Sequence, residues 1–580
     1  MPIPGFISKT TAMKNNFFCT LLVILLITGF SVSCNTGLDD DLASAENNAE
    51  INESADDYVW DKSTETKIVL QGSAATITGS GASASGSMVT IKSAGNYNFS
   101  GNLTDGQILV NTSDQGIVRV ILSGVTISNS SGIPLYVASA EKTILVLSAN
   151  TVNSLSDGKY TTTDEPNAAV FSKSDLAIFG DGSLTVNGNS YDGISGKDGL
   201  IIRSGTIVVN AADDGIRGKD YLVVRDGSIT VTSKGDGLKS DNSDDETCGY
   251  FTCEGGTLKI ASGGDAIAAE TDVLISKGIF TITSGGGSGV SANSTVSSKG
   301  IKSGVSMTIN EGTFTCNCSD DALHSNGKLT INKGTFTLST GDDGIHADSD
   351  LELSGGNITV TKSYEGIESR TILKINDGNI SVTSSDDGIN VGADTGFGGP
   401  GGMGGSTTTT KNYLYVNGGS VYLNANGDGI DINGSVVMAG GSLIINGPTS
   451  SGNGALDYNN SFKMTGGFLV AAGSSGMAQA PDATSTQRSV LINFKSSQKA
   501  ATFVRIQTTT GTNVLTFQPV KNFQSIAFSS PDLSNGTGYE IFTGGAFSGT
   551  GVNGIYQEGT YSGGAKYGSF TVSGIVTKVN

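Results

Sequence analysis

Short apolar runs alternate with polar positions along most of the chain, and glycine-rich turns separate the runs. A typical stretch is Leu351-Glu-Leu-Ser-Gly-Gly-Asn-Ile-Thr-Val360, in which β-branched residues lie on both sides of a turn. Alternation of this kind, without a helical period, is typical of short strands joined by turns. The pattern therefore predicts an all-β protein.

One phrase, Asp-Gly-Ile or a close variant, recurs along this pattern. Its copies begin at Asp192, Asp214, Asp236, Asp265, Asp321, Asp343, Glu365, Asp387 and Asp428. Five of the gaps are 22 residues (214 − 192, 236 − 214, 343 − 321, 365 − 343 and 387 − 365). The others are 29, 56 and 41, and Ser288-Gly289-Val290 divides the 56 into 23 and 33. A fixed period in the low twenties indicates stacked supersecondary units.

A unit of 22 residues at about 3.3 Å per residue forms one closed coil of a few short strands. Coils stacked about 4.8 Å apart pair each strand with its copies above and below, which satisfies the backbone groups between coils. The Ile or Leu of each phrase then falls in one internal column. We predict a right-handed parallel β-helix, because parallel crossovers are right-handed.

The predicted β-helix covers residues 60–465, and its first coils are irregular enough to serve as a cap. A Gly-rich loop at 394–411 extends from one coil and accounts for the gap of 41 residues. In residues 466–580 the period is lost, and the remaining apolar runs predict an antiparallel β cap.

Composition and charge narrow the function classes. The 83 glycines and the 15% of charged residues suit a protein with a turn in every coil. The net charge of −20 argues against a nucleic-acid partner, which needs a basic surface. The same charge favours divalent cations and keeps an extended surface soluble.

Residues 1–34 have the features of a signal peptide, because Lys9 and Lys14 precede an apolar run at 17–30. Ser31-Val32-Ser33-Cys34 resembles a relaxed bacterial lipoprotein box, in which Cys34 carries the lipid. Residues 35–59 predict a disordered acidic tether. We expect an exported monomer that is lipid-anchored to the outer membrane or cell surface and has no other membrane contact; simple secretion is the alternative.

The acid of each phrase is the first candidate site. Carboxylates of successive coils lie about 5 Å apart, where two charges repel by about 3 kcal/mol at an effective dielectric of 20. Ca²⁺, which takes about six to eight oxygen ligands, would cancel this repulsion. The alternative is that Asp-Gly is only a turn with solvated charges, although Asn would serve a turn equally well. The predicted ligands are Asp192, Asp213, Asp214, Asp236, Asp265, Asp320, Asp321, Asp342, Asp343, Glu365, Asp386, Asp387 and Asp428.

A second column follows the Ile or Leu of each phrase and points outward if that residue points inward. Its candidate ligand-binding residues are Arg217, Lys239, His324, His346 and Glu368. The two histidines and Glu368 could bind a transition metal or hydrogen-bond a sugar, and the basic pair could hold a uronate carboxylate. An ordinary solvated polar face is the alternative.

Three lysines are candidate bases if the protein is a lyase: Lys197, Lys219 and Lys239. A lysine beside a cation has a lowered pKa and could remove a proton next to a carboxylate. Surface lysines paired with Asp198 and Asp220 are the alternative, and we favour it over a catalytic role.

The cysteines give only a weak indication of a zinc site, because neither pair has metal-site spacing with histidines nearby. Cys248 and Cys253 lie in the gap of 29 residues, where a disulfide would close a small excursion. Cys316 aligns with Leu338 one coil later, a core position that suits a buried small hydrophobe.

Taken together, these motifs resemble the bacterial carbohydrate-binding domain-containing family of calcium-binding parallel β-helix proteins. The resemblance runs from Trp60 to the C-terminus. It is carried by Ile91-Lys-Ser-Ala-Gly-Asn-Tyr97, Asp105-Gly-Gln-Ile108, Ile121-Leu-Ser-Gly-Val-Thr-Ile127, the Asp-Asp-Gly-Ile phrases, the Gly/Met-rich insertion and Gly476-Met-Ala-Gln-Ala-Pro481. It implies calcium on the carboxylates of the coils and a shape related to family 9 pectate lyases.

The resemblance also implies binding of cellulose or pectic acid, as in the clostridial surface protein that is the founding type. We therefore expect calcium-dependent polysaccharide binding at the bacterial cell surface, with acidic glycans such as pectate favoured. Two alternatives stay open: a polysaccharide lyase that cleaves uronates by β-elimination, and a structural adhesin without a sugar site.

Overall fold

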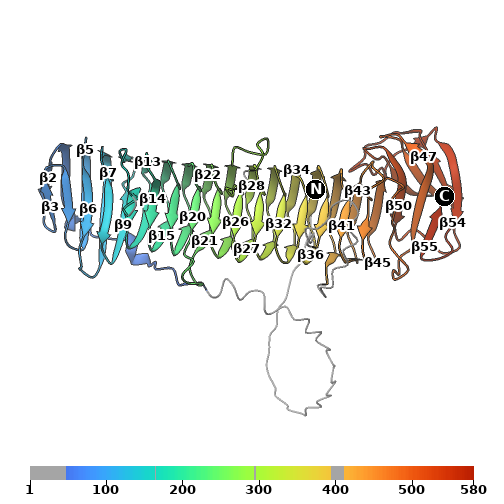
Figure 1. Ribbon diagram of the computed structural model, residues 1–580, viewed down its shortest axis with the longest axis horizontal. Coiled ribbons are helices and arrows are strands. Elements are labelled where there is room, and N and C mark those ends of the chain that lie inside the picture. Colours follow the sequence, from blue (N-terminus) through green and yellow to red (C-terminus); the bar gives the residue numbers. More distant parts are fainter. Residues whose placement is uncertain (1–47, 163–164, 293–294, 393–410) are drawn as a thin grey trace, which may run out of the picture. The chain divides into compact units, whose positions relative to one another are not determined.

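The computed structural model describes residues 48–162, 165–292, 295–392 and 411–580. This part of the chain is an all-β protein in which parallel strands stack coil upon coil (Figure 1). Each regular coil contributes three strands, which form three columns along the stack. These pairings confirm the predicted parallel β-helix. No helix in the described residues is long and apolar enough to cross a membrane.

The first column is a sheet of 16 strands. Its strands are β3 (Ala82–Ser85), β4 (Met88–Ile91), β6 (Gln107–Asn111), β8 (Leu135–Ser139), β11 (Ala168–Ser172), β14 (Asp192–Gly196), β17 (Ile216–Gly218), β20 (Leu238–Ser240), β23 (Ile267–Ala269), β26 (Ile301–Ser303), β29 (Leu323–Ser325), β32 (Ile345–Ala347), β35 (Ile367–Ser369), β38 (Ile389–Val391), β41 (Ile430–Ile432) and β44 (Asp457–Tyr458). From β14 to β41, these strands carry the Asp-Gly-Ile phrase or a variant of it, or directly follow its first two residues; at β26 those two residues are Lys299-Gly300.

The second and third columns belong to one larger sheet. The second contains β9 (Lys142–Leu147), β12 (Asp175–Gly180), β15 (Gly199–Ile202), β18 (Tyr221–Val224), β21 (Tyr250–Cys253), β24 (Asp272–Ile275), β27 (Ser306–Ile309), β30 (Lys328–Ile331), β33 (Leu351–Leu353), β36 (Ile372–Ile375), β39 (Tyr413–Val416), β42 (Ser435–Met438) and β45 (Ser461–Met464). The third contains β10 (Val152–Ser156), β13 (Ser183–Gly188), β16 (Thr206–Ala211), β19 (Ser228–Thr232), β22 (Thr257–Ser262), β25 (Ile279–Ser284), β28 (Thr313–Cys318), β31 (Thr335–Thr340), β34 (Asn357–Lys362), β37 (Asn379–Ser384), β40 (Ser420–Ala425), β43 (Ser442–Asn446) and β46 (Phe468–Gly473).

The Ile or Leu of each phrase forms the internal column that the sequence predicted. In-register pairs run from Ile194 to Ile216 and onward through Leu323 to Ile430, and these side chains are 0% exposed. The third column adds a stack of Phe280, Phe314 and Phe336, with ring centroids 4.6 Å apart. The core is therefore a set of identical columns that repeat once per coil.

The structure corrects the position of one coil. Ile301, rather than Val290, pairs with Ile267 on one side and with Leu323 on the other. Val290 is exposed and lies outside the strands. The coil at Ile301 was missed because its phrase is Lys299-Gly300-Ile301, with a lysine in the place of the acid.

The N-terminal coils begin with two antiparallel hairpins and three long strands. β1 (Thr66–Gly72) pairs with β2 (Ala75–Thr78), and β3 pairs with β4, in antiparallel fashion. β1, β5 (Gly95–Leu103) and β7 (Ile117–Ser128) then pair in parallel. β7 also pairs in parallel with both β9 and β10. These hairpins begin the stack at the end where the sequence predicted irregular capping coils.

Residues 48–59 are ordered, which corrects part of the predicted disordered tether at 35–59; its remainder lies outside the described residues. Their 3₁₀ turn η1 (Ala55–Tyr58) precedes a second turn, η2 (Lys62–Thr64). Ile51, Tyr58 and Trp60 pack on the outer face of the second column, against a cluster that includes Ile201 and Val223. The sequence contained an indication of this contact. Strands β15 and β18 are apolar on both faces, as strands that are buried on both sides are.

The C-terminal region is an antiparallel cap, as predicted, although parallel stacking continues past residue 465 to β46. β50 pairs antiparallel with both β46 and β47, and a separate antiparallel sheet has the order β49-β48-β51-β54. The cap strands are β47 (Ser489–Gln498), β48 (Val504–Thr508), β49 (Asn513–Phe517), β50 (Phe523–Ser529), β51 (Gly538–Thr543), β52 (Ala546–Phe547), β53 (Tyr561–Ser562), β54 (Ala565–Thr571) and β55 (Val576–Val579).

Two predictions about cysteines have different outcomes. Cys316 is buried and pairs in register with Leu338, as expected. Cys248 and Cys253 do not form the disulfide that was considered, and both are buried free thiols. The Sγ atom of Cys253 donates to the carbonyl of Gly255 at 3.2 Å, so this side chain turns into its own coil. The signal segment with Cys34 and the Gly-rich loop, except Lys411, lie outside the described residues.

Candidate functional site

The aspartates of the phrase form a column, interrupted at Lys299 and Glu365, at the corner between the third strand of one coil and the first-column strand that follows. One carboxylate oxygen of each residue accepts a hydrogen bond from the backbone N–H of the next coil. The distances are 2.7 Å from Asp236 N to Asp214 Oδ1 and 2.9 Å from Asp343 N to Asp321 Oδ1. At the last phrase the N–H of Gly454 donates to Asp428 Oδ1 at 2.5 Å. The column therefore joins consecutive coils.

The second carboxylate oxygen of several aspartates contacts a cationic side chain. Lys239 Nζ lies 3.1 Å from Asp214 Oδ2 and 2.8 Å from Asp236 Oδ2. Lys299 Nζ lies 2.7 Å from Asp321 Oδ2 and 2.8 Å from Asp320 Oδ1. From Asp214 to Asp343, lysine and histidine side chains thus supply counter-charges to the column.

This arrangement gives a second reason for aspartate at these positions. An asparagine could accept the backbone N–H, but its amide nitrogen could not pair with a lysine. The preference for Asp over Asn, which the sequence offered as an argument for calcium, is therefore explained by protein side chains in these coils.

The two ends of the column differ from these coils. At the first coil Asp192 is buried without an ion pair in the described structure, and burial raises its pKa to about 7. The coils from Glu365 to Asp428 form the other end. Among the described residues, none of Glu365, Asp387 and Asp428 forms an ion pair. Burial raises the pKa of Asp387 to about 8, that of Glu365 to about 7 and that of Asp428 to about 6, and neighbouring carboxylates add to each shift. Ligand oxygens of Asp387, Asp428 and Asp431 lie within 4.8 Å of one another. Such a group is costly to ionise unless a cation joins it.

Asn390 lies beside this acidic group, three residues after Asp387 and in register with Asp431. Its Nδ2 donates to Glu365 Oε2 at 2.9 Å. Its Oδ1 is buried and has no hydrogen-bond partner among the described residues, and the residue is 7% exposed. An amide oxygen left in this state is a ligand that a hard cation accepts.

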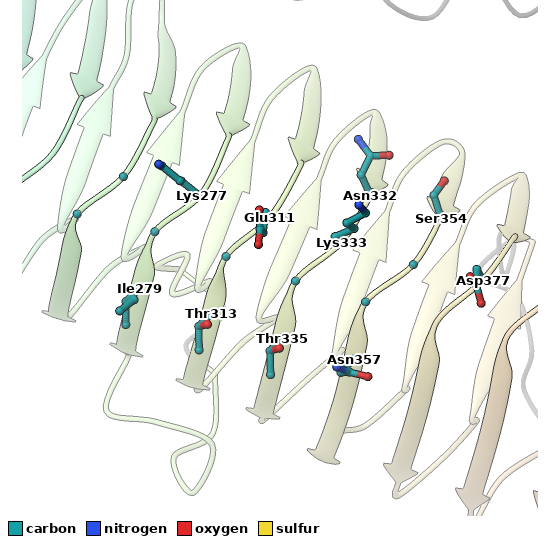
Figure 2. A pocket seen from close by; sticks show the side chains of 17 residues that line it. Lys277, Ile279, Glu311, Thr313, Asn332, Lys333, Thr335, Ser354, Asn357 and Asp377 are labelled. Atoms are coloured by element: carbon teal, nitrogen blue, oxygen red, sulfur yellow. The ribbon is translucent and has the colours of Figure 1, made fainter. Parts of the chain in front are cut away.

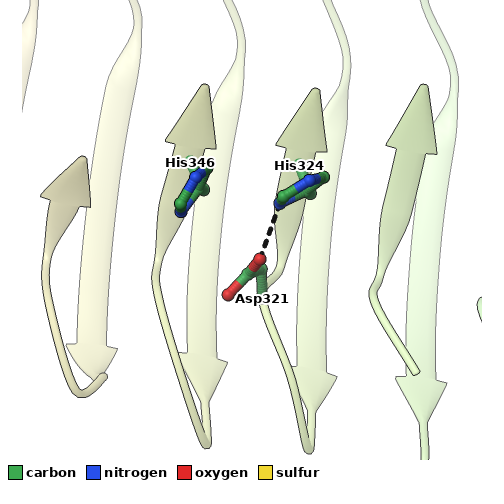
Figure 3. Close-up of side chains that lie close together, drawn as sticks. All are labelled: Asp321, His324 and His346. Atoms are coloured by element: carbon green, nitrogen blue, oxygen red, sulfur yellow. Dashed lines mark hydrogen bonds and ion pairs between the residues drawn. The ribbon is translucent and has the colours of Figure 1, made fainter. Parts of the chain in front are cut away.

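The two histidines lie on neighbouring coils, with their rings stacked at 4.7 Å (Figure 3). His324 Nδ1 contacts Asp321 Oδ2 at 2.8 Å, and His346 Nδ1 contacts Asp343 Oδ2 at 2.8 Å and Glu368 Oε2 at 3.0 Å. Both rings are therefore occupied by carboxylates of this chain. Candidate metal-ligand sets include each histidine, but in the described structure the Nδ1 atom of each ring already contacts a carboxylate.

We expect His346 to make the stability of the β-helix pH-dependent. Burial alone would lower its pKa, but the hydrogen bonds to Asp343 and Glu368 raise it from 6.5 to about 11. The contribution of His346 to the free energy of unfolding is complete below its unfolded pKa. This contribution is lost as pH rises through the folded pKa, by up to about 1.4 kcal/mol per pH unit. Chemical unfolding of wild type and His346→Gln at about pH 6, just below the unfolded pKa, and at about pH 10 should show their difference shrinking. A difference that grows with pH would contradict this assignment.

The remaining candidates occupy separate places along the column. Asp213 and Asp342 are exposed, and Asp320 and Asp386 are partly buried beside the phrase aspartates. Arg217 does not face a free cavity, because its Nε contacts the two carboxylate oxygens of Asp241 at 2.9 and 3.0 Å.

The three candidate lysine bases all lie in ion pairs. Lys197 pairs with Glu165, and Lys219 pairs with Asp244 at 3.0 Å, so neither has the neighbouring acid that the sequence suggested. Burial would lower the pKa of Lys239, but Asp214 and Asp236 raise it. The pKa of Lys219 is also raised, chiefly by Asp244. Neither lysine has the lowered pKa that a base near neutral pH needs.

Sequence reasoning missed three functional side chains of this column: Lys299, Lys302 and Asn390. Lys302 follows Ile301 in the outward column, and its Nζ lies 3.8 Å from Asp265 Oδ2. Both lysines would have been found from Ile301, which stands 22 residues before Leu323. Asn390 was visible in the column but carries no charge, so it was passed over as a ligand.

The fold and this column define a class of protein, namely a parallel β-helix with a ladder of inter-coil carboxylates. Comparison with known proteins makes this more specific. A family model described as carbohydrate-binding domain-containing protein matches residues 85–344 and 342–513. The chain therefore belongs to the family of carbohydrate-binding domain-containing proteins.

Two known proteins illustrate the relationship. A carbohydrate-binding domain-containing protein of Acetivibrio thermocellus is 45% identical over 201 residues, which cover 34% of this chain and 70% of that protein. The solved structure of a polysaccharide lyase-like protein from C. thermocellum, a gadolinium derivative, is 33% identical and covers 38% of this chain and 92% of its own. Its TM-score against this chain is 0.36.

Proposed function

We propose that this protein binds polysaccharide at the bacterial cell surface and that Ca²⁺ held in the last coils makes the binding calcium-dependent. Membership in the carbohydrate-binding domain-containing family supports the polysaccharide ligand. The observation that carries the calcium proposal is the contrast along the acid column. Lysines and histidines contact the phrase carboxylates from Asp214 to Asp343, whereas Glu365, Asp387 and Asp428 form no ion pair in the described structure. Asp192 forms none either, but among the described residues it belongs to no cluster of three potential ligands.

The donor set in the last coils suits calcium. Asp387, Asp428 and Asp431 offer carboxylate oxygens, and Asn390 offers a buried amide oxygen. Ca²⁺ prefers such an all-oxygen set, whereas a transition metal would prefer sites with imidazole nitrogen. We place the calcium here and not at the histidines, whose ring nitrogens already contact carboxylates.

Acidic glycans such as pectate are the favoured ligands, and cellulose is a further one. A protein with a net charge of −20 repels an anionic chain. A cation held between protein carboxylates and uronate carboxylates removes this repulsion and adds direct ligands. Binding of pectate should therefore require calcium, whereas binding of an uncharged chain should not.

The cellular location is part of the proposal and depends on the N-terminal sequence. Export through the signal segment and lipidation of Cys34 would hold the protein at the outer membrane or cell surface. The mass of the N-terminal peptide isolated from cells is the direct check, since an attached lipid changes it.

A pull-down of the full-length protein on pectate and on cellulose tests the function. Each matrix is used with calcium and with a chelator, and the supernatant is assayed for unsaturated uronate product. We expect calcium-dependent retention on pectate without product. Product formation would identify a lyase, although the three candidate lysine bases lie in ion pairs in the described structure. Absence of retention in both buffers on both matrices would leave a structural adhesin and defeat the proposal.

A further inference from the structure

A second candidate binding surface lies away from the acid column. It is an open trough of about 700 Å³ that crosses successive coils from Gly255 to Asp377 (Figure 2). The trough follows the turns between the second-column and third-column strands. The acid column lies at a different corner of each coil, between the third strand and the first-column strand that follows.

The floor of the trough consists of glycines that no other residue can replace. Gly278, Gly312 and Gly334 have φ values of 144°, 145° and 128°. A Cβ atom at these positions would lie 2.9, 2.7 and 2.9 Å from the ring of Phe280, Phe314 or Phe336 respectively. The floor therefore rests directly on the phenylalanine stack of the core.

The walls carry polar groups of balanced charge. Two lysines, Lys277 and Lys333, alternate along the trough with two acids, Glu311 and Asp377. In the described structure Lys277, Glu311 and Lys333 form no ion pair and no side-chain hydrogen bond. Their charges cancel within the trough, although the whole chain is strongly acidic. Such groups can donate to or accept from hydroxyls without favouring an anion.

Third-column strands complete one wall with short side chains. Thr313, Thr335 and Asn357 line the trough at successive coils, next to Ile279, which is 52% exposed. Hydroxyl and amide groups suit the hydroxyls of a sugar, and an exposed isoleucine suits the C–H face of a sugar ring. A shallow apolar surface with a few fixed polar groups is the usual form of a ligand site.

We propose that this trough binds a neutral, unbranched polysaccharide chain that runs across the coils. The wall residues repeat once per coil, and stacked rings beneath them repeat every 4.6 Å, a distance close to the length of one pyranose unit in an extended chain. Successive sugar units therefore meet corresponding wall positions, at which lysines and acids alternate. The inference rests on the proposed polysaccharide binding, but it assigns a second site that needs no calcium.

Affinity electrophoresis of the full-length protein in gels with hydroxyethylcellulose tests the site. The trough variant is Thr313→Arg/Thr335→Arg, which places two long side chains where the glycan would lie. The matched control is Thr315→Arg/Thr337→Arg, which changes exposed threonines on the same strands, β28 and β31, outside the trough. Thermal unfolding of both variants checks that the fold is intact.

We expect chelator-resistant retardation of the wild type, an apparent affinity at least about tenfold weaker for the trough variant, and wild-type behaviour for the control. Pectate retention in calcium should be unchanged in both variants. Equal weakening of trough variant and control, or none in either, would overturn the trough assignment. A wild type that binds pectate but not hydroxyethylcellulose would also overturn it and leave the proposed function standing. A wild type that binds neither defeats both.

Discussion

The double variant Asp387→Asn/Asp428→Asn is expected to lose calcium binding while remaining folded. Each asparagine keeps the oxygen that accepts the N–H of the next coil, at Asp428 N and Gly454 N respectively. It removes the charge on which a hard cation depends. Calcium at 100 times its Kd stabilises a one-site protein by about 2.7 kcal/mol, and the variant should lose most of this gain.

The variant should not be less stable than wild type in chelator. Burial raises the pKa of Asp387 to about 8, so the ionised carboxyl opposes folding at neutral pH. A carboxyl with a raised folded pKa destabilises the protein above its unfolded pKa, and a neutral amide removes this penalty. Equal or higher stability without calcium, together with a lost response to calcium, would separate ligand loss from a folding defect.

Asp236→Asn/Asp265→Asn is the matched control, because these aspartates make the same backbone contact but lie near Lys239 and Lys302. Calcium should stabilise this control as much as it stabilises wild type. Thermal unfolding with calcium and with chelator measures all three proteins. If the control and the double variant lost the calcium response equally, the metal site would not be confined to the last coils.

The fold could be predicted from sequence because its core is periodic. The internal residue of each coil, from Ile194 to Ile430, must be apolar and must recur once per coil, so the repeat is visible in a single chain. Residues 48–59 were wrongly predicted to be disordered, because the surface on which they pack is the outer face of β15 and β18. A run such as Tyr221-Leu-Val-Val224 shows burial on both faces but does not say which segment covers it.

The candidate site was predictable only in outline. The acidic positions repeat with the coil and were found, but their partners do not repeat. Lys299 occupies an acid position in one coil, and Asn390 occupies a position held by histidine at 324 and 346. A charge balance that changes from coil to coil depends on which side chains face each other, and the period alone does not contain it.

Lys299→Met is expected to lower the free energy of unfolding by about 3–5 kcal/mol, the cost of leaving a buried charge without its partner. Its Nζ lies 2.8 Å from Asp320 Oδ1 and 2.7 Å from Asp321 Oδ2, and the two carboxylates are 14% and 4% exposed. Together with the charge of Lys299, the hydrogen bond from His324 overcomes the effect of burial and lowers the pKa of Asp321. Methionine keeps the length of the stem and removes the ammonium group with its charge and its hydrogen-bond donors.

Lys302→Met is the control for this substitution. Its Nζ lies 3.8 Å from Asp265 Oδ2, and its side chain is 32% exposed, so its loss should cost about 1 kcal/mol or less. Urea unfolding in chelator measures both variants. Similar losses for the two lysines would show that Lys299 is not a counter-charge of the column.

The same variant also tests how calcium is distributed. Oxygens of Asp320, Asp321 and Asp342 lie within 4.8 Å of one another and meet Lys299 in the wild type. Without the ammonium group, this cluster resembles the acidic group at Asp387, except that His324 Nδ1 still contacts Asp321 Oδ2 at 2.8 Å. Calcium should therefore restore part of the stability that Lys299→Met loses, and stabilise it more than it stabilises wild type. A variant that calcium does not rescue would mean that removal of Lys299 is not sufficient to make a metal site in this column. The calcium assigned to the last coils would then depend on the amide oxygen of Asn390.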